Sequence, residues 1–200
     1  MEGKSMTETT VKEKTLLGRT TIGFWLYLMT DCLLFASLFA TFAVLRTATA
    51  DGPSGRDIFE LPMVLTETII LLTSSFTCGL ALIALKNKNI RYVVAALAAT
   101  YILGVAFLTM EITEFAKLAA EGHSWQQSAF LSSFFTLVAT HGLHILIGLI
   151  WLVVMVGVLF KKGLTSKVTR QLTLFGLFWH FLDLVWIFIF TVVYLIGASS

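Results

Sequence analysis

Five long apolar stretches, separated by short polar ones, make up most of the chain. Each is longer than the roughly 20 residues that an α-helix needs to cross a hydrocarbon core of about 30 Å. Backbone groups in lipid must be bonded within their own segment, and strands of membrane barrels have only about ten residues, so helices are predicted. The predicted fold class is an all-α integral membrane protein, a bundle of five transmembrane helices. The predicted spans are residues 22–45, 62–85, 92–115, 130–160 and 172–196.

The polar segments define the predicted domain organisation. Residues 1–18 are predicted to be a disordered, polar cytoplasmic tail, and residues 19–200 to be a single membrane domain. The first apolar stretch has 24 residues, whereas the core of a signal peptide has roughly 7 to 15, so this span is predicted to be retained. Residues 51–55, DGPSG, are typical of a turn between the first two spans.

The composition supports lipid as the main solvent of this chain. Hydrophobic residues make up 57% of the chain, charged residues 13%, and the mean hydropathy is +0.87, which is far from the composition of a soluble domain. Cys32 and Cys78 both lie within apolar stretches, where a free cysteine behaves as a small hydrophobic residue. The basic residues form no patch for nucleic acid, so no nucleic-acid partner is expected.

Lys and Arg are distributed unequally between alternate loops. Eleven lie in the N-terminal segment and in the second and fourth loops, whereas Arg46, Arg56 and Lys117 are the three on the other side. The positive-inside rule therefore predicts a cytoplasmic N-terminus and an extracytoplasmic C-terminus. Trp25, Tyr92, Trp125 and Tyr194 lie near span ends and are predicted to be interfacial anchors. Small residues at four-residue spacing, such as Ala95 with Ala99, predict close helix contacts.

Eight ionisable side chains fall within or near the ends of the predicted spans. Because a charge at the centre of a bilayer costs at least about 2.5 to 3.5 kcal/mol, such groups are expected to face a protein interior or a partner. Spacing along the spans places the Glu residues nearer the outer surface and the Asp and His residues at middle depth. The eight are Asp31, Glu67, Glu111, Glu114, His141, His144, His180 and Asp183.

Two kinds of role are open for these side chains. The His and Asp residues could hold a metal or, with His141 or His144 paired to His180, a haem. A hydrogen-bond network that orients the spans is favoured, because no set of three or four converging metal ligands is evident. Asp31 is either part of a proton relay or a structural acid at a subunit contact, and the structural role is favoured for the Glu residues too. A free-standing membrane b-type cytochrome and a small proton or ion transporter are the functional alternatives.

Several strings resemble subunit III of the haem–copper oxidases, and the resemblance covers nearly the whole chain from about residue 18. It is carried by GFWLYLMTDCLLFASLFATFAVL from Gly23, DGPSGRDIFELP from Asp51 and TMEITEF from Thr109. THGLHILIGLIW from Thr140 and FWHFLDLVWIFIFTVVYLIG from Phe178 are the most specific strings. With five spans, the chain is similar to the form of this family found in cytochrome bo-type ubiquinol oxidases.

The resemblance implies a non-catalytic subunit of a proton-translocating quinol oxidase in the aerobic respiratory chain. It implies no haem or copper in this chain, with both in a partner catalytic subunit, and it implies subunits I, II and IV and membrane lipids as partners in a bacterial inner membrane. Asp31 falls where the family carries a buried carboxylate, which in seven-span members is Glu. Structural roles are implied for Glu111, His144, His180, Asp183 and Trp186. An accessory subunit of nitric oxide reductase is the nearest alternative.

Overall fold

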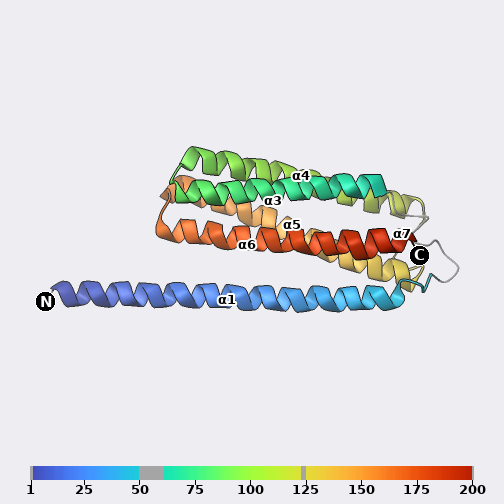
Figure 1. The fold of residues 1–200 in the computed structure, drawn as a ribbon, viewed down its shortest axis with the longest axis horizontal. Helices are drawn as coiled ribbons and strands as arrows, with labels where there is room; N and C mark the ends of the chain where they lie inside the picture. The colour runs from blue at the N-terminus through green and yellow to red at the C-terminus, as the bar shows by residue number, and fades with distance from the viewer. Residues whose placement is uncertain (1, 50–60, 123–124, 200) are drawn as a thin grey trace. The chain divides into compact units, whose positions relative to one another are not determined.

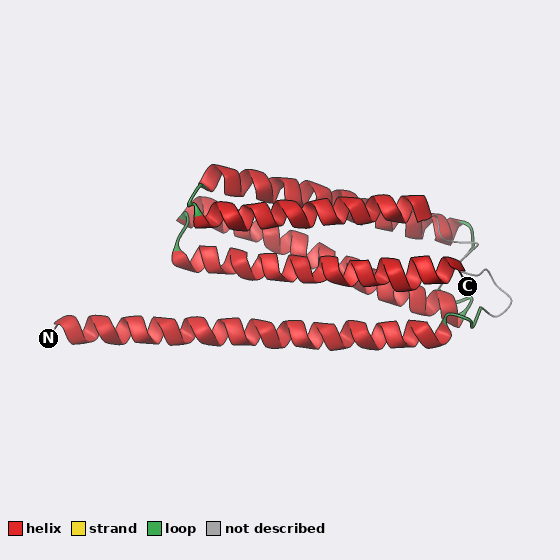
Figure 2. Ribbon diagram, viewed as in Figure 1, coloured by secondary structure: helices red, strands yellow, loops and turns green. Residues whose placement is uncertain are grey.

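The computed structural model describes the backbone of residues 2–49, 61–122 and 125–199, and the side chains within these ranges from Gly18 to Gly197. All of its regular structure is helical in these ranges (Figure 2). Five helices are long and apolar enough to cross a membrane. The prediction of an all-α protein with five membrane-spanning helices is therefore confirmed. The predicted turn at residues 51–55 lies outside the described residues.

The chain divides into two compact units, Met1–Ala36 and Ser37–Ser200. The first unit is the N-terminal part of helix α1, which runs over Glu2–Leu45. Because α1 begins at Glu2, the expectation of a disordered tail before the first span was wrong. The tail contains no proline, and its Lys and Glu residues are compatible with continuing the helix of the span.

The second unit contains the last turns of α1 and four long helices. These are α3 (Leu61–Lys86), α4 (Ile90–Ala120), α5 (Ala129–Lys162) and α6 (Ser166–Ile189). After α6 come a π-helix, η1 (Phe190–Leu195), and the short α7 (Ile196–Ser199). Consecutive long helices run in opposite directions (Figure 1). The end of α1 joins this unit through ring contacts of Phe39 with Phe188 and of Phe42 with Phe130, at centroid distances of 6.3 and 6.0 Å.

The helices extend beyond the apolar stretches from which they were predicted. Helix α6 begins six residues before its predicted span, because the Thr165 side chain caps it by accepting a hydrogen bond from the Val168 N–H at 3.3 Å. Ser128 caps α5 in the same way, accepting from the Leu131 N–H at 3.1 Å. Apolar sequence marks the part of a helix that lipid surrounds, whereas capping residues mark where the helix itself begins.

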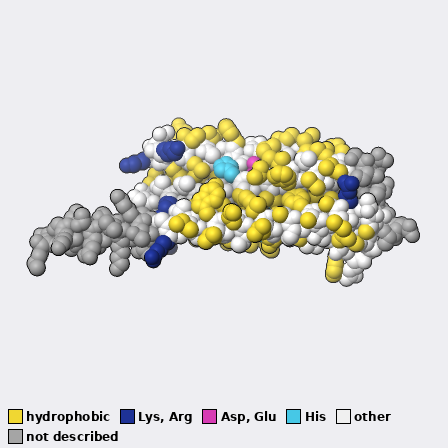
Figure 3. Space-filling model, turned by 60° about the horizontal axis from the view of Figure 1, so that its bottom comes forward, with side chains coloured by type: hydrophobic (Ala, Val, Ile, Leu, Met, Phe, Trp, Pro, Cys, Tyr) yellow, Lys and Arg dark blue, Asp and Glu magenta, His cyan; other side chains and the backbone are white. Residues whose placement is uncertain are grey.

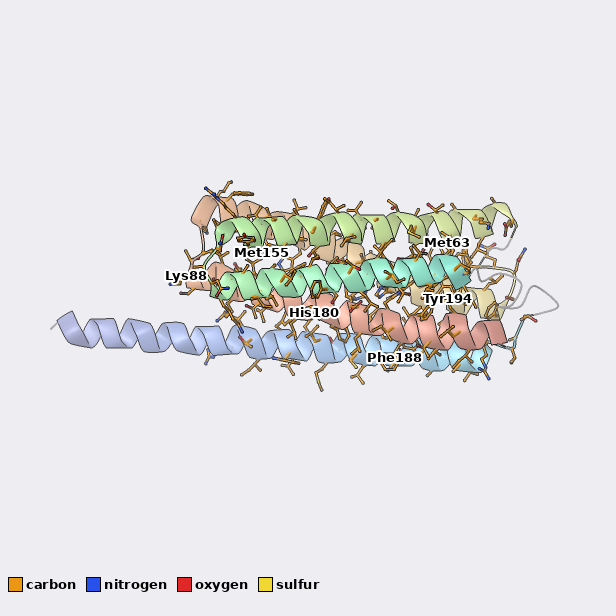
Figure 4. All side chains as sticks on the ribbon, turned by 45° about the horizontal axis from the view of Figure 1, so that its top comes forward. Met63, Lys88, Met155, His180, Phe188 and Tyr194 are labelled. Carbon is orange, nitrogen blue, oxygen red and sulfur yellow. The ribbon has the colours of Figure 1, made fainter. Side chains whose placement is uncertain are left out.

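The turns at one end of the second unit carry most of its basic residues, and we call this the basic end. They connect α3 with α4 and α5 with α6. Figure 4 places Lys88 towards this end, Tyr194 towards the other, and His180 between them. The basic residues of these turns and the adjoining helix ends are Lys86, Lys88, Arg91, Lys161, Lys162 and Lys167.

Candidate functional site

Three buried glutamates lie together towards the end of the second unit opposite the basic end. Glu67 of α3 and Glu111 and Glu114 of α4 are 0%, 2% and 7% exposed. Their carboxyl groups are close enough to interact electrostatically with one another. The Tyr194 hydroxyl donates a hydrogen bond of 3.0 Å to Oε2 of Glu114. This carboxyl cluster therefore connects α3, α4 and the C-terminal helical segment across the interior of the unit.

The π-helix η1 brings Tyr194 into this cluster. Tyr194 follows Trp186 by eight residues. In a regular α-helix, two turns and a further rotation of about 80° would separate these side chains, so they would point in different directions. A π-helix has wider turns that hold more residues, so the chain turns less and Tyr194 stays above Trp186, with ring centroids 6.2 Å apart. The Tyr194 ring is fully buried. Tyr194 is thus an interior hydrogen-bond donor, and the prediction that it is an interfacial anchor was wrong.

Glu67 and Glu111 carry carboxyl oxygens that no hydrogen bond from the described residues satisfies. These atoms are Oε1 and Oε2 of Glu67 and Oε2 of Glu111. The Glu111 carboxyl lies against the α5 backbone at Gly142, where an added Cβ would be 2.9 Å from its Cδ and Oε2. A buried polar group without a partner costs about 1 to 3 kcal/mol, and buried water commonly satisfies such groups in proteins. The cluster can therefore bind water or exchange a proton within the interior of the unit.

A histidine and a tryptophan form the adjoining layer. The His141 ring is fully buried and lies 5.2 Å from Trp186 and 6.0 Å from Phe107, measured between centroids. The Trp186 ring meets Phe107 edge-on at 4.7 Å, and its Nε1–H donates to the Thr68 hydroxyl at 3.1 Å. His141 is therefore enclosed by aromatic rings from α4 and α6 and belongs with the Glu cluster, since Gly142 beside it meets Glu111.

A second polar group lies about midway along the helices, on α3 and α6. Nδ1 of His180 and the Ser75 hydroxyl are 2.7 Å apart. Asp183, one turn after His180, lies close to both residues, and its Oδ1 has no hydrogen-bond partner among the described residues. These three side chains line a hollow of about 360 Å³ whose other walls are mostly apolar. Figure 3 shows histidine and acidic side chains at the surface of an otherwise apolar belt.

The Trp179 ring is wedged between two glycines of neighbouring helices. A Cβ added at Gly104 of α4 would lie 2.9 Å from Leu149 and 3.0 Å from the Trp179 ring. A Cβ added at Gly148 of α5 would lie 2.9 Å from the same ring. The Trp179 Nε1–H donates to the Ser74 hydroxyl at 3.1 Å, and Ser74 donates to the Thr100 carbonyl at 3.2 Å. These contacts hold α3, α4, α5 and α6 together at the depth of the second polar group, since Ser74 and Trp179 directly precede Ser75 and His180 in the chain.

Two candidates remain, one in each unit. On α5, Nδ1–H of half-buried His144 donates to the Thr140 carbonyl one turn earlier, at 2.7 Å. Asp31 lies in the first unit, one turn after Tyr27, whose hydroxyl is within hydrogen-bonding reach of its carboxyl. Within the described ranges, no three His, Cys, Asp or Glu side chains gather as metal ligands.

The sequence missed several residues that build these sites. Thr68, Ser74 and Thr100 are ordinary helix residues in a sequence, yet each is a hydrogen-bond partner across a helix interface. Gly104 and Gly148 are isolated glycines without the four-residue spacing that was used to predict close contacts. The only signal in the sequence for these two glycine contacts was the large Trp179 side chain, because a large ring inside a helix bundle needs a small residue opposite it.

Comparison with known proteins identifies the family. A sequence profile described as cytochrome c oxidase subunit III matches residues 5–198. The cytochrome bo(3) ubiquinol oxidase subunit 3 of Pseudomonas aeruginosa is 57% identical over 181 residues, which are 90% of this chain and 87% of the relative. The subunit of that name from Buchnera aphidicola subsp. Baizongia pistaciae is 44% identical over 197 residues, 98% of this chain and 99% of the relative. The cytochrome c oxidase subunit 3 of Bacillus sp. strain PS3 is 44% identical over 176 residues, 88% and 85% of the two chains.

The profile and the relatives agree along nearly the whole chain. A subunit III works within an oxidase complex, so other oxidase subunits are partners of this chain. These relatives are all bacterial. With five helices able to cross a membrane, the chain is a multi-pass protein of the bacterial inner membrane and belongs to the cytochrome c oxidase subunit III family.

Proposed function

We infer that this chain is the non-catalytic subunit III of a proton-translocating quinol:oxygen oxidoreductase in an aerobic respiratory chain. The observation that carries the inference is the 57% identity, over 90% of the chain, with a ubiquinol oxidase subunit. A relative at 44% identity is named as a cytochrome c oxidase subunit, so quinol is the favoured electron donor and cytochrome c the second candidate. Haem and copper belong to the catalytic subunit I, and subunits II and IV complete the complex.

The role of this chain is to stabilise the catalytic subunit and to support its proton uptake. Large apolar side chains remain exposed on the outward faces of the helices, for example Ile102, Leu143, Ile150 and Phe188. These faces need lipid or partner helices. Figure 3 shows apolar side chains spread over most of one face, with backbone and other side chains between them. The buried acids supply the polar groups that could keep an adjoining proton path hydrated.

Co-purification tests this function. A chain with an affinity tag after Ser200, extracted in mild detergent, should bring down a large polytopic haem protein with quinol oxidase activity. Quinol and reduced cytochrome c should each be offered as electron donor, since the two candidate donors differ only in this result. Recovery with a nitric oxide reductase, or of the chain alone with a haem spectrum, would contradict the proposal.

The orientation can be tested by fusing reporters to the chain. We propose a cytoplasmic N-terminus, because the loops predicted to be cytoplasmic hold eleven of the Lys and Arg residues. Alkaline phosphatase fused after Ser200 should be active, and the same enzyme fused in the turn after Lys162 should be inactive. The reverse pattern would place the basic end outside the cytoplasm.

Asp31 is proposed to have a structural role, which two substitutions can separate from proton transfer. Asp31→Asn should retain assembly and initial turnover, because the amide keeps the shape and hydrogen-bonding capacity of the acid. Asp31→Leu should weaken assembly by about 1 to 3 kcal/mol, since polar partners would lose their hydrogen bonds. Combining each with Tyr27→Phe measures how much of this cost involves the Tyr27 hydroxyl.

Oxygen consumption and proton release in vesicles measure both outcomes. A fully assembled Asp31→Asn enzyme that loses proton pumping at once would require a titratable group at this position. The structural role would then be rejected in favour of a proton relay.

A further inference from the structure

The turn between α3 and α4 presents a lysine in a backbone conformation that favours glycine. Lys88 has φ of 53°, where an L-residue with a Cβ is strained. The turn is held by hydrogen bonds from the Lys88 N–H to the Leu85 carbonyl and from the Asn89 N–H to the Ala84 carbonyl, at 3.1 and 3.2 Å. Helices commonly place glycine at such a position. A strained lysine at an exposed turn suggests that its side chain has a role that glycine could not fill.

Two adjoining hollows open beside this turn. The first, of about 690 Å³, is lined by Ile90 and Ala95 and by polar and basic side chains that include Lys88, Arg91 and Tyr92. The second, of about 520 Å³, runs between α3 and α4 along small and aliphatic side chains such as Ile83, Ala96 and Ala99. Both are lined by Asn87, Asn89, Tyr92 and Ala95. The two hollows are therefore one surface, with a basic mouth and an apolar groove.

The hairpin of α3 and α4 provides no acidic side chain near the basic residues of this turn. Lys86, Lys88 and Arg91 are exposed, and residues 68–110 contain no Asp or Glu. Tyr92 is 69% exposed, between the basic turn and the apolar groove, as is typical of a tyrosine at headgroup level. The surface thus changes from positive to apolar over about two turns of α4, as an anionic lipid changes from headgroup to acyl chain.

We propose that this surface binds one anionic phospholipid. Its phosphate lies between Lys88 and Arg91, its glycerol backbone lies beside Tyr92, and one acyl chain occupies the groove between α3 and α4. A helix with its side chains is about 10 Å across, so a volume of 520 Å³ would hold little more than one turn of it. A flexible acyl chain is much thinner than a helix and can therefore follow the groove. A free phosphate would fill the mouth but would leave the groove empty.

Native mass spectrometry of the full chain tests the proposal. The chain is taken from vesicles that contain phosphatidylglycerol and phosphatidylcholine in equal amounts, and the bound lipids are counted. One phosphatidylglycerol should be retained in preference to phosphatidylcholine. Each basic group near a membrane surface contributes roughly fivefold to the binding of anionic lipid, so Lys88→Gln with Arg91→Gln should weaken retention roughly 30-fold.

Matched variants distinguish this site from general surface charge and from misfolding. Lys161→Gln with Lys162→Gln removes equal charge at the same end, lines neither hollow, and should change retention only a few-fold. Lys88→Gly removes the charge and relieves the strained turn, so it should weaken retention while the hairpin folds at least as well. Ala99→Leu fills the groove and should weaken retention, whereas Ala98→Leu, on the adjacent face of α4 beside another hollow, should not.

Four results would overturn the proposal. Equal retention of the two lipids would mean that the mouth does not select an anionic headgroup. If the double variant at Lys88 and Arg91 and the double variant at Lys161 and Lys162 lose equal retention of phosphatidylglycerol, the effect is one of general surface charge. Retention unchanged by Ala99→Leu would mean that the groove holds no acyl chain. If the assembled oxidase retains no phosphatidylglycerol that depends on Lys88 and Arg91, a neighbouring subunit covers the groove and the lipid assignment is wrong.

Discussion

Replacing Gly104 and Gly148 together by alanine should destabilise the chain by about 2 to 6 kcal/mol, because each added methyl group overpacks a filled interior at about 1 to 3 kcal/mol. The added Cβ atoms would lie within 3.0 Å of the Trp179 ring from two different helices. Trp179 is fully buried and its Nε1–H is bonded to Ser74. The ring therefore cannot move away from one helix without losing that bond or meeting the other helix.

The measurement is unfolding of the purified full chain in mixed micelles as the fraction of denaturing detergent rises, followed by near-ultraviolet circular dichroism. Gly157→Ala is the matched control, since it lies in α5 with Gly148 but has no atom within 4 Å of an added Cβ. It should be neutral or stabilising by up to about 1 kcal/mol through helix propensity. A double variant as stable as Gly157→Ala would show that Trp179 is not wedged between these helices.

Trp186→Ala should cost about 3 to 5 kcal/mol, the range for removing a buried aromatic ring. The ring is fully buried and contacts Phe107, His141 and Tyr194 at centroid distances of 4.7, 5.2 and 6.2 Å. The substitution would leave a void beside the carboxyl cluster. It should therefore lower both the stability of the chain and its recovery in the oxidase complex.

Trp186→Phe and Thr68→Val separate packing from hydrogen bonding. Trp186→Phe retains an aromatic ring but removes the Nε1–H donor to Thr68, so about 1 to 2 kcal/mol should be lost, and much of this should disappear in the Thr68→Val background. Trp125, which is 60% exposed, provides the control, because Trp125→Ala should change stability by no more than about 0.5 kcal/mol. Equal losses for Trp186→Ala and Trp125→Ala would contradict the packing described for Trp186.

The grouping of the polar side chains shows where sequence reasoning reached its limit. Depth along each span was correct enough to place Glu67, Glu111 and Glu114 towards one end and His180 with Asp183 nearer the middle. His141 was assigned to the middle group, yet it lies beside Trp186 and Phe107, in the layer that adjoins the Glu cluster. Depth along a span was not enough for grouping, because neighbours across helices also depend on the rotation and crossing of the helices.

Tyr194 shows a second limit, which comes from local geometry. Its place near the end of an apolar stretch is also that of an interfacial anchor, so the sequence favoured that role. The π-helix changes the direction of the side chain and points it at Glu114. Residues 190–195 alone do not predict a π-helix, because the tertiary contacts of their side chains stabilise it.

By itself the sequence determined the membrane environment, the five helices and their approximate ends. The physical reason is that lipid imposes both apolar composition and internally satisfied backbone hydrogen bonds on each span separately, so these properties are local. Only the tertiary structure decided which polar groups meet: Tyr194 with Glu114, Trp186 with Thr68, and His180 with Ser75. Such pairs join residues 80 to 118 positions apart, and between lipid-soluble helices they depend on packing and hydrogen bonds that no single span encodes.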